Sequence, residues 1–149
     1  DIFAHRGIDE HYFTENNTQG IAKTLEIAKT DFDGLCYTNL VDCDMLYGHR
    51  RDIDGYAKAI SEFDDCLPRL AGDLRDDDFL IITADHGCDP GFKGTDHTRE
   101  YVPLLIYSKS IKGKNLGTID GFGAVADTVL SMFDIKSTLD GKHILDEIR

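Results

Sequence analysis

The stretch that decides the fold is FLIITADHGCDPGFKGTDHTREYVPLLIY, residues 79–107. It places two short apolar runs, 79–84 and 103–107, on either side of a loop over 85–100 that is rich in Gly, Asp and His. Short apolar runs bounded by polar loops are typical of buried strands. Because an Asp-His pair directly follows the first run, the groups that could do chemistry lie where a strand ends.

The pattern of alternating elements continues outside this stretch. Helical periodicity predicts helices over 17–29, 53–74 and 121–133. Within the second of these helices, Pro68 predicts a kink or a break. A further apolar run over 34–41 predicts another buried strand. Strands that alternate with helices indicate an α/β fold, in which parallel sheets keep their active sites at the carboxyl ends of the strands.

Composition excludes several classes of protein. The chain has 149 residues, 41% of them hydrophobic, and a net charge of −12. A chain of this length is normally one domain, and this composition is that of neither a disordered tail nor a membrane protein. No apolar run reaches the roughly 18 residues of a membrane span. The acidity argues against a nucleic-acid partner, since phosphate backbones are held by clustered Lys and Arg.

The cysteines indicate a reducing environment. The sequence has four of them, Cys36, Cys43, Cys66 and Cys88, and no two form a CxxC pair. Spacings of this kind do not match a zinc ribbon or a thioredoxin-type motif. We expect four free thiols and therefore a cytoplasmic protein.

Two clusters of Asp and His follow predicted strands. The segment VDCDMLYGHRRD (41–52) follows one strand, and the 85–100 loop follows another. The candidate groups are Asp42, Asp44, His49, Asp85, His86, Asp89, Asp96 and His97. Carboxylate oxygen and imidazole nitrogen are ligands for manganese, zinc and iron. Turn chemistry or a surface ion-pair patch could each explain one cluster. Two clusters together favour a divalent-metal site, which in an acidic chain would let an anionic phosphate substrate bind.

At these residues the chain resembles a known family. The segments NLVDCDMLYGHRRD (39–52) and ITADHGCDPGFKGTDHTREYVPLLIYS (82–108) are similar to those of the phosphopentomutases, of the alkaline phosphatase superfamily. The helix GYAKAISEFDDCLPRL (55–70) and the ending HILDEI (143–148) add to the resemblance. It implies an alkaline-phosphatase-like core, a three-layer α/β/α fold with a mostly parallel sheet, of which residues 1–149 are a C-terminal portion.

The resemblance also implies a ligand set for two divalent cations, usually manganese. Asp44, His49 and His97 would hold one ion, and Asp85 and His86 the other. Spacing alone leaves Asp42 and Asp44 as alternatives, because they lie two residues apart on one face of a continued strand. The family pattern selects Asp44.

The implied reaction moves phosphate between the C1 and C5 oxygens of ribose or deoxyribose, through a phosphorylated enzyme threonine. The family's threonine, one further aspartate ligand and its cap domain have no counterpart here, so no catalytic residue is assigned in this chain. The chain begins at Asp1 and its only methionines are Met45 and Met132. We therefore expect a piece of a longer enzyme that is inactive alone, its partners being a pentose phosphate and the missing N-terminal part.

Other residues near the implied ligands have two interpretations each. Asp96 either orients a ligand or is a loop carboxylate. The arginines Arg50, Arg51 and Arg99 either contact phosphate or orient carboxylates, or else form structural ion pairs. Cys88 stands where the family commonly has Asn after DHG, and it is not expected to be a ligand.

Three other functions remain open at this point. One is a metal-dependent phosphatase, phosphodiesterase or sulfatase of the same superfamily, which would release its product to water. A second is a phosphoglycerate mutase, which shares DHG and a later His but not GHRRD with GTDHTREYVP. The third is a non-catalytic metal-binding fragment or scaffold module.

Overall fold

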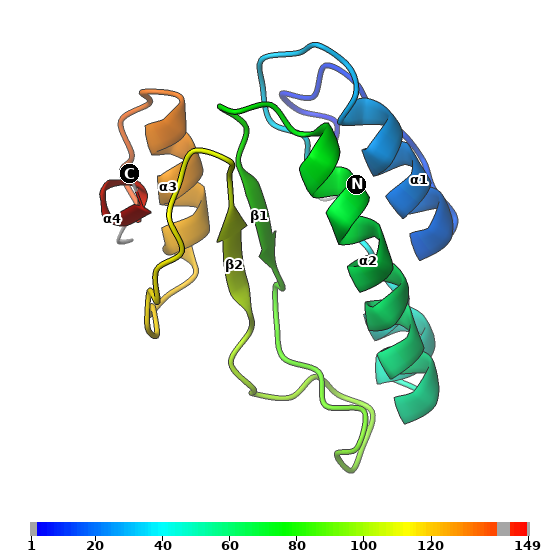
Figure 1. Ribbon diagram of the computed structural model, residues 1–149. Helices are drawn as coiled ribbons and strands as arrows, with labels where there is room; N and C mark the ends of the chain where they lie inside the picture. Colours follow the sequence, from blue (N-terminus) through cyan, green and yellow to red (C-terminus); the bar gives the residue numbers. More distant parts are fainter. Residues whose placement is uncertain (1–2, 140–143, 149) are drawn as a thin grey trace. The chain divides into compact units, whose positions relative to one another are not determined.

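The computed structural model describes residues 3–139 and 144–148, and Figure 1 shows the order of their helices and strands. This part of the chain divides into two compact units, with the boundary after Tyr107. His143, the first residue of the HILDEI ending, lies outside the described residues. Within the described ranges, no helix has the length and the apolar character that a membrane crossing requires.

Two α-helices of the first unit pack against each other (Figure 1), namely α1 (Asn17–Ile27) and α2 (Ile53–Asp73). The side chain of Asn16 caps α1 and that of Asp52 caps α2, because each accepts a backbone N–H of the first turn. Leu25 of α1 is buried, with 7% of its surface exposed. Both helices confirm the helices predicted from periodicity.

The α2 helix continues through Pro68 to Asp73, so the predicted break is wrong. A proline in a helix interior removes one backbone hydrogen bond, which costs about 3 kcal/mol in an isolated helix. Here the helix buries Ala59 and Leu70, which are 4% and 3% exposed. Packing of this apolar face offsets the cost of the proline, because tertiary contacts outweigh local propensity.

The strands β1 (Leu80–Thr83) and β2 (Leu104–Tyr107) confirm the two apolar runs but not their predicted direction. They pair in antiparallel fashion, with Leu80 opposite Tyr107 and Thr83 opposite Leu104. The described residues therefore show one two-stranded antiparallel sheet, where a mostly parallel sheet in three layers was expected. The physical reason is the connection: a loop joins the strands, whereas a parallel pair needs a crossover that is usually a helix.

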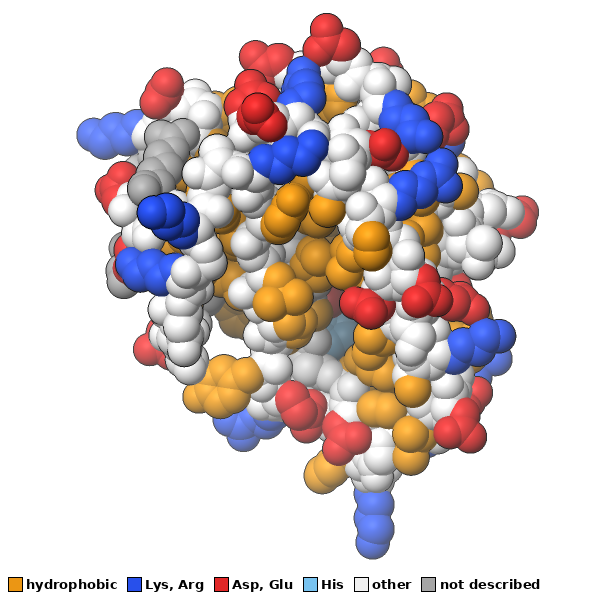
Figure 2. All heavy atoms as spheres, in the orientation of Figure 1, with side chains coloured by type: hydrophobic (Ala, Val, Ile, Leu, Met, Phe, Trp, Pro, Cys, Tyr) orange, Lys and Arg blue, Asp and Glu red, His pale blue; other side chains and the backbone are white. Residues whose placement is uncertain are grey.

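The strand predicted over 34–41 is wrong. The segment has no regular secondary structure, and residues 34–39 are exposed, with Leu35 61% and Tyr37 55% accessible. A strand needs a neighbour for its N–H and C=O groups, and none of the described residues pairs with this segment. Figure 2 shows other hydrophobic side chains that also reach the surface between charged groups.

The second unit contains α3 (Gly123–Met132) and the short α4 (Leu145–Ile148), which contact each other. Here α3 confirms the helix predicted over 121–133. Thr128 is fully buried, and its hydroxyl donates to the carbonyl of Ala124 at 2.7 Å and accepts the N–H of Ile144 at 3.1 Å. This hydroxyl satisfies the buried backbone where the chain enters α4.

Candidate metal centre

A π-helical turn, η1 (Cys43–Gly48), presents Asp44 and leads directly to His49. The backbone N–H of His49 donates to the carbonyl of Asp44 at 3.1 Å, which closes the wide turn. Such turns are rare and often occur at functional sites. The turn brings Nε2 of His49 to 3.4 Å from Oδ1 of Asp44.

Gly48 lets this turn pack closely against the segment after β1. A Cβ atom at Gly48 would lie 2.5 Å from Sγ of Cys88 and 2.9 Å from the carbonyl oxygen of Cys43. Gly48 is buried and no larger residue fits without movement. The glycine that precedes His49 is thus a requirement of the site, because it sets the approach of η1 to the segment that carries His86.

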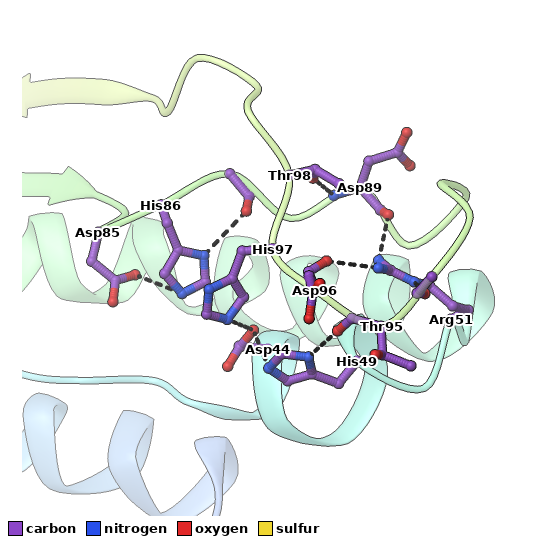
Figure 3. A network of polar contacts seen from close by, with 12 residues as sticks. Asp44, His49, Arg51, Asp85, His86, Asp89, Thr95, Asp96, His97 and Thr98 are labelled. Carbon is purple, nitrogen blue, oxygen red and sulfur yellow. Dashed lines mark hydrogen bonds and ion pairs between the residues drawn. The ribbon is translucent and has the colours of Figure 1, made fainter.

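His86 and His97 come from opposite ends of the loop that joins β1 to β2. An isolated antiparallel bridge between Gly87 and Thr98 closes the base of this loop, and the N–H of Thr98 donates to the carbonyl of Gly87 at 3.1 Å. The two imidazole rings stack, with centroids 3.6 Å apart and planes at 20°. Figure 3 shows both rings above Asp44. The bridge therefore makes neighbours of histidines that are distant in sequence.

Oδ1 of Asp44 lies at the centre of the cluster. It is 3.3 Å from Nε2 of His97 and 3.4 Å from Nε2 of His49. It is buried, yet it has no hydrogen-bond partner among the described residues. An unpaired buried carboxylate oxygen is costly, so its presence here calls for a positive partner.

Hydrogen bonding fixes the face that His49 turns to this oxygen. Nδ1 of His49 contacts the carbonyl oxygen of Thr95. Since a carbonyl can only accept, Nδ1 carries the proton and donates, and Nε2 of a neutral ring is left with a lone pair toward Asp44. Two acceptors then face each other, and a cation between them removes the repulsion.

The donor set fits a metal ion in chemistry and in spacing. Ligand atoms of Asp44, His86 and His97 all lie within 4.8 Å of one another. Two ligands at about 2.1 Å from one tetrahedral ion are about 3.4 Å apart, close to the Asp44–His97 and Asp44–His49 separations above. Mixed carboxylate and imidazole donors suit manganese, zinc or iron rather than calcium.

The remaining residues suggested by the sequence lie around this cluster. Asp85 has an 87% exposed side chain with Oδ1 3.7 Å from Nε2 of His86, on the side of that ring away from His97 (Figure 3). Asp96 is exposed, and its backbone carbonyl, not its carboxylate, accepts from Nη2 of Arg51 at 2.7 Å. Arg50 and Arg99 are also exposed.

Asp42 has a different role from Asp44. Its Oδ2 accepts the backbone N–H of Asn17 at 2.8 Å, and its own N–H donates to Oδ1 of Asn17 at 3.0 Å. The two carboxylates, which spacing could not separate, therefore face different partners: Asp42 faces the start of α1 and Asp44 faces the histidines.

Two cysteine thiols near the cluster have pKa values raised above their ordinary value. Burial, and then the charge of Asp44, raise the pKa of the Cys88 thiol. Burial, and then the charge of Asp42, raise the pKa of the Cys43 thiol. In both cases burial is the larger cause, because it disfavours the charged thiolate, and a nearby carboxylate adds to the shift.

Sequence reasoning missed the backbone contacts that assemble the site. The contact of Thr95 with His49, and the bonds from Arg51 to three carbonyl groups, leave no signal in residue type. A Gly directly before His49 was the one visible sign of close packing. Backbone acceptors are common to all residues, so only the folded structure shows which are used.

With this geometry established, comparison with known proteins identifies the class. The chain belongs to the metalloenzyme superfamily, whose family model matches residues 5–137. Membership in this superfamily implies that the protein binds a divalent metal ion, in agreement with the donor set around Asp44.

Within this class the chain is similar to several curated phosphopentomutases. It is 51% identical over 148 residues to that of Lachnoclostridium phytofermentans and 53% identical over 149 residues to that of Acetivibrio thermocellus. It is also 51% identical over 149 residues to the phosphopentomutase of Clostridioides difficile. In all three cases the match covers 99% of this chain and 38% of the relative, so the chain spans little more than a third of their length.

Proposed function

We propose that this chain carries most of the metal centre of a phosphopentomutase, which interconverts the 1-phosphate and 5-phosphate of ribose or deoxyribose. The observation that carries the proposal is the buried, unpaired Oδ1 of Asp44 within reach of three imidazoles. The identity of about 50% to enzymes of that name supports the choice of reaction.

The proposed ligands divide between two cations. Asp44, His49 and His97 hold one ion, which agrees with the two separations from Oδ1 of Asp44. Asp85 and His86 contribute to the second ion, next to the first because His86 stacks on His97. We propose manganese, because this mixture of oxygen and nitrogen donors suits it.

Bound divalent ions would supply Lewis-acid chemistry and neutralise the charge of a transferring phosphoryl group. This chain's own residues set the conditions for that role. Nδ1 of His49 carries the proton and donates a hydrogen bond to the Thr95 carbonyl, so Nε2 keeps a lone pair that can bind a metal ion. The carboxylate of Asp44 supplies the negative charge that draws cations to the cluster. We assign the phosphoryl-accepting nucleophile to no threonine of this chain.

The proposal extends to the protein as a whole. We propose an alkaline-phosphatase-like core with a mostly parallel sheet, in a cytoplasmic enzyme. Residues 1–149 would then be the C-terminal part of that core, with the nucleophile and a cap domain elsewhere. Support comes from the match of the metalloenzyme family model to residues 5–137 and from the 38% coverage of the relatives.

Manganese binding tests the metal centre directly. Electron paramagnetic resonance reports free Mn²⁺ during a titration, which gives stoichiometry and affinity without activity. We expect Asp44→Asn and His97→Ala to weaken binding by about 100-fold or more, since ligands matter at least as much as the groups that orient them. Asp76→Asn, in an exposed loop, is the matched control and should bind as the wild type does. Unchanged binding in Asp44→Asn would exclude this centre.

Phosphorus NMR with ribose 1-phosphate and Mn²⁺ tests the reaction. A longer protein that joins this chain to the remaining length of its relatives should yield ribose 5-phosphate, and the 149-residue chain alone should yield no product. Inorganic phosphate as the main product would indicate a phosphatase of the same superfamily instead. Mutase turnover by the chain alone would contradict the placement of the nucleophile.

A further inference from the structure

Three consecutive backbone carbonyls of the β1–β2 loop accept hydrogen bonds from one short segment after η1. Nε of Arg51 donates to Gly94, and Nη2 of Arg51 donates to Asp96 at 2.7 Å. Between them, Thr95 accepts from His49. A fourth bond runs from Nη1 of Arg51 to the carbonyl of Asp89 at 2.8 Å, at the other side of the loop (Figure 3).

The loop over 89–97 has few other restraints. Its residues are exposed apart from Pro90, and it contains Gly91 and Gly94. Its base is closed by Thr98, whose hydroxyl accepts the N–H of Asp89 at 2.6 Å. Among the described residues, the hydrogen bonds that reach the far part of the loop from another element come from His49 and Arg51. An exposed glycine-containing loop loses considerable conformational entropy when it is ordered, so these bonds decide whether it stays in place.

An arginine is suited to this task and a lysine is not. A guanidinium group has five N–H donors in a rigid planar fork, whereas an ammonium group is a compact point charge on a flexible stem. Here all three nitrogens of the fork are used, each on a different carbonyl. The contacts are therefore directional, and positive charge alone would not reproduce them.

The backbone at Arg51 is strained in a way that serves these contacts. Its φ of +56° lies in the left-handed region, which costs a non-glycine residue about 1–2 kcal/mol. Such conformations persist where the surrounding structure determines them, and they are concentrated at functional sites. The residue lies where the chain leaves η1 and enters α2, and its side chain reaches back to the loop that carries His97.

We propose that Arg51 is a positioning residue of the metal centre: by holding Asp89, Gly94 and Asp96 it carries His97 to Oδ1 of Asp44. The effect on metal binding rests on the proposed function above, whereas the effect on the loop does not. Arg51 acts through the loop and touches neither the metal nor a substrate. Loss of the Arg51 side chain removes no metal ligand, but it removes the hydrogen bonds that hold the loop carrying His97.

Two readouts on the full chain separate these effects. The first is the rate of trypsin cleavage after the exposed Lys93, inside the loop, followed by mass spectrometry with a chelator present. The second is Mn²⁺ affinity by electron paramagnetic resonance. Arg51→Ala and Arg51→Lys should each be cleaved about tenfold faster and bind Mn²⁺ about 10- to 100-fold more weakly, the range seen for groups that orient metal ligands.

Arg50→Ala is the matched control, because it removes the same charge from the neighbouring exposed residue. Arg51→Gly is the second variant, since glycine accepts a φ of +56° without strain and so protects the fold while it deletes the side chain. Added ethylguanidinium should restore Lys93 protection and Mn²⁺ affinity to Arg51→Gly, and should not restore affinity to Asp44→Asn.

The outcomes are distinct. If Arg51→Gly matches Arg50→Ala within twofold in both readouts, the proposal is overturned. Faster cleavage with unchanged Mn²⁺ affinity also overturns it, because Arg51 would then hold the loop without positioning a ligand. If the wild type binds no Mn²⁺, the proposed metal centre fails, and the cleavage rates still show whether Arg51 clamps the loop.

Discussion

Asp42 and Asn17 exchange two hydrogen bonds that join the start of α1 to the entrance of η1. The N–H of Asn17 donates to Oδ2 of Asp42 at 2.8 Å, and the N–H of Asp42 donates to Oδ1 of Asn17 at 3.0 Å. Asn17 is only 2% exposed, so its side of this pair is shielded from water, and Asp42 is partly buried. The pair gives Asp42 a structural role in a segment where Asp44, two residues on, belongs to the candidate metal centre.

This relationship predicts a loss of stability without a loss of metal binding. Asp42→Ala and Asn17→Ala should each lower the free energy of unfolding by about 1–3 kcal/mol, because each leaves a shielded partner unsatisfied. The double variant should lose less than the sum of the two. Urea denaturation measures the effect, and Mn²⁺ affinity of Asp42→Ala should stay within threefold of wild type. A large loss of affinity with little loss of stability would instead make Asp42 a ligand.

Gly48 gives a prediction about packing. Gly48→Ala should lower the free energy of unfolding by about 1–3 kcal/mol, because its Cβ would meet Sγ of Cys88 at 2.5 Å. Thermal denaturation measures the change. Cys88→Ala in the same chain should restore part of the lost stability. The rest should remain lost, because the Cβ would still lie 2.9 Å from the carbonyl oxygen of Cys43.

Gly72→Ala is the control for that experiment. It lies inside α2, and a Cβ there would have no heavy atom within 4 Å. Alanine favours helix over glycine, so this variant should be as stable as wild type or up to about 1 kcal/mol more stable. Equal effects at Gly48 and Gly72 would show that close packing at η1 is not limiting.

Thiol chemistry gives a prediction about pH. Burial raises the pKa of the Cys66 thiol in α2, so its reactive thiolate is scarce at neutral pH. Alkylation of Cys66 by iodoacetamide should be slower than that of the exposed Cys36 and should accelerate about tenfold per pH unit below the pKa. Mass spectrometry of the labelled peptides gives both rates, and in urea the difference should vanish.

The sign of the linked stability effect follows from the same shift. A pKa raised by folding means that the folded state holds the proton more tightly than the unfolded state does. The contribution of Cys66 to stability is therefore complete below the unfolded pKa and is lost as the pH rises through it toward the folded pKa. Cys66→Ala should lose less stability than wild type on that alkaline side, and an equal loss would assign the effect to other groups.

Local sequence was sufficient for the elements that depend on local chemistry. Helical periodicity predicted α1 and α3, and apolar runs predicted β1 and β2, because the burial of a face determines the spacing of apolar residues. Prediction from local sequence failed for 34–41, because a strand there would need a neighbouring strand. It also failed at Pro68, where packing of α2 offsets the cost of a proline inside a helix. The direction of the strands was also predicted wrongly, although the loop over 85–100 contains no helix that could serve as a parallel crossover.

The candidate site divides in the same way. Residue type indicated Asp44, His86 and His97 as metal donors, and the structure gathers these three. Spacing could not separate Asp42 from Asp44, since that choice depends on Asn17, which lies far away in sequence. Nor could it assign Arg51, whose partners are backbone carbonyls and whose role depends on loop conformation.

Addition of Mn²⁺ should stabilise the protein, and addition of Ca²⁺ should not. An ion that binds the folded state alone adds about 2.7 kcal/mol at 100 times its dissociation constant. We expect Mn²⁺ to raise the melting temperature, and a chelator to reverse the rise. Ca²⁺ should have little effect, because it prefers six to eight oxygen ligands and this cluster offers three imidazoles around Asp44. Asp44→Asn should abolish the Mn²⁺ shift while Asp76→Asn keeps it. An equal shift with Ca²⁺, or a shift that survives Asp44→Asn, would mean that the ions bind to exposed carboxylates of this acidic chain and not to the histidine cluster.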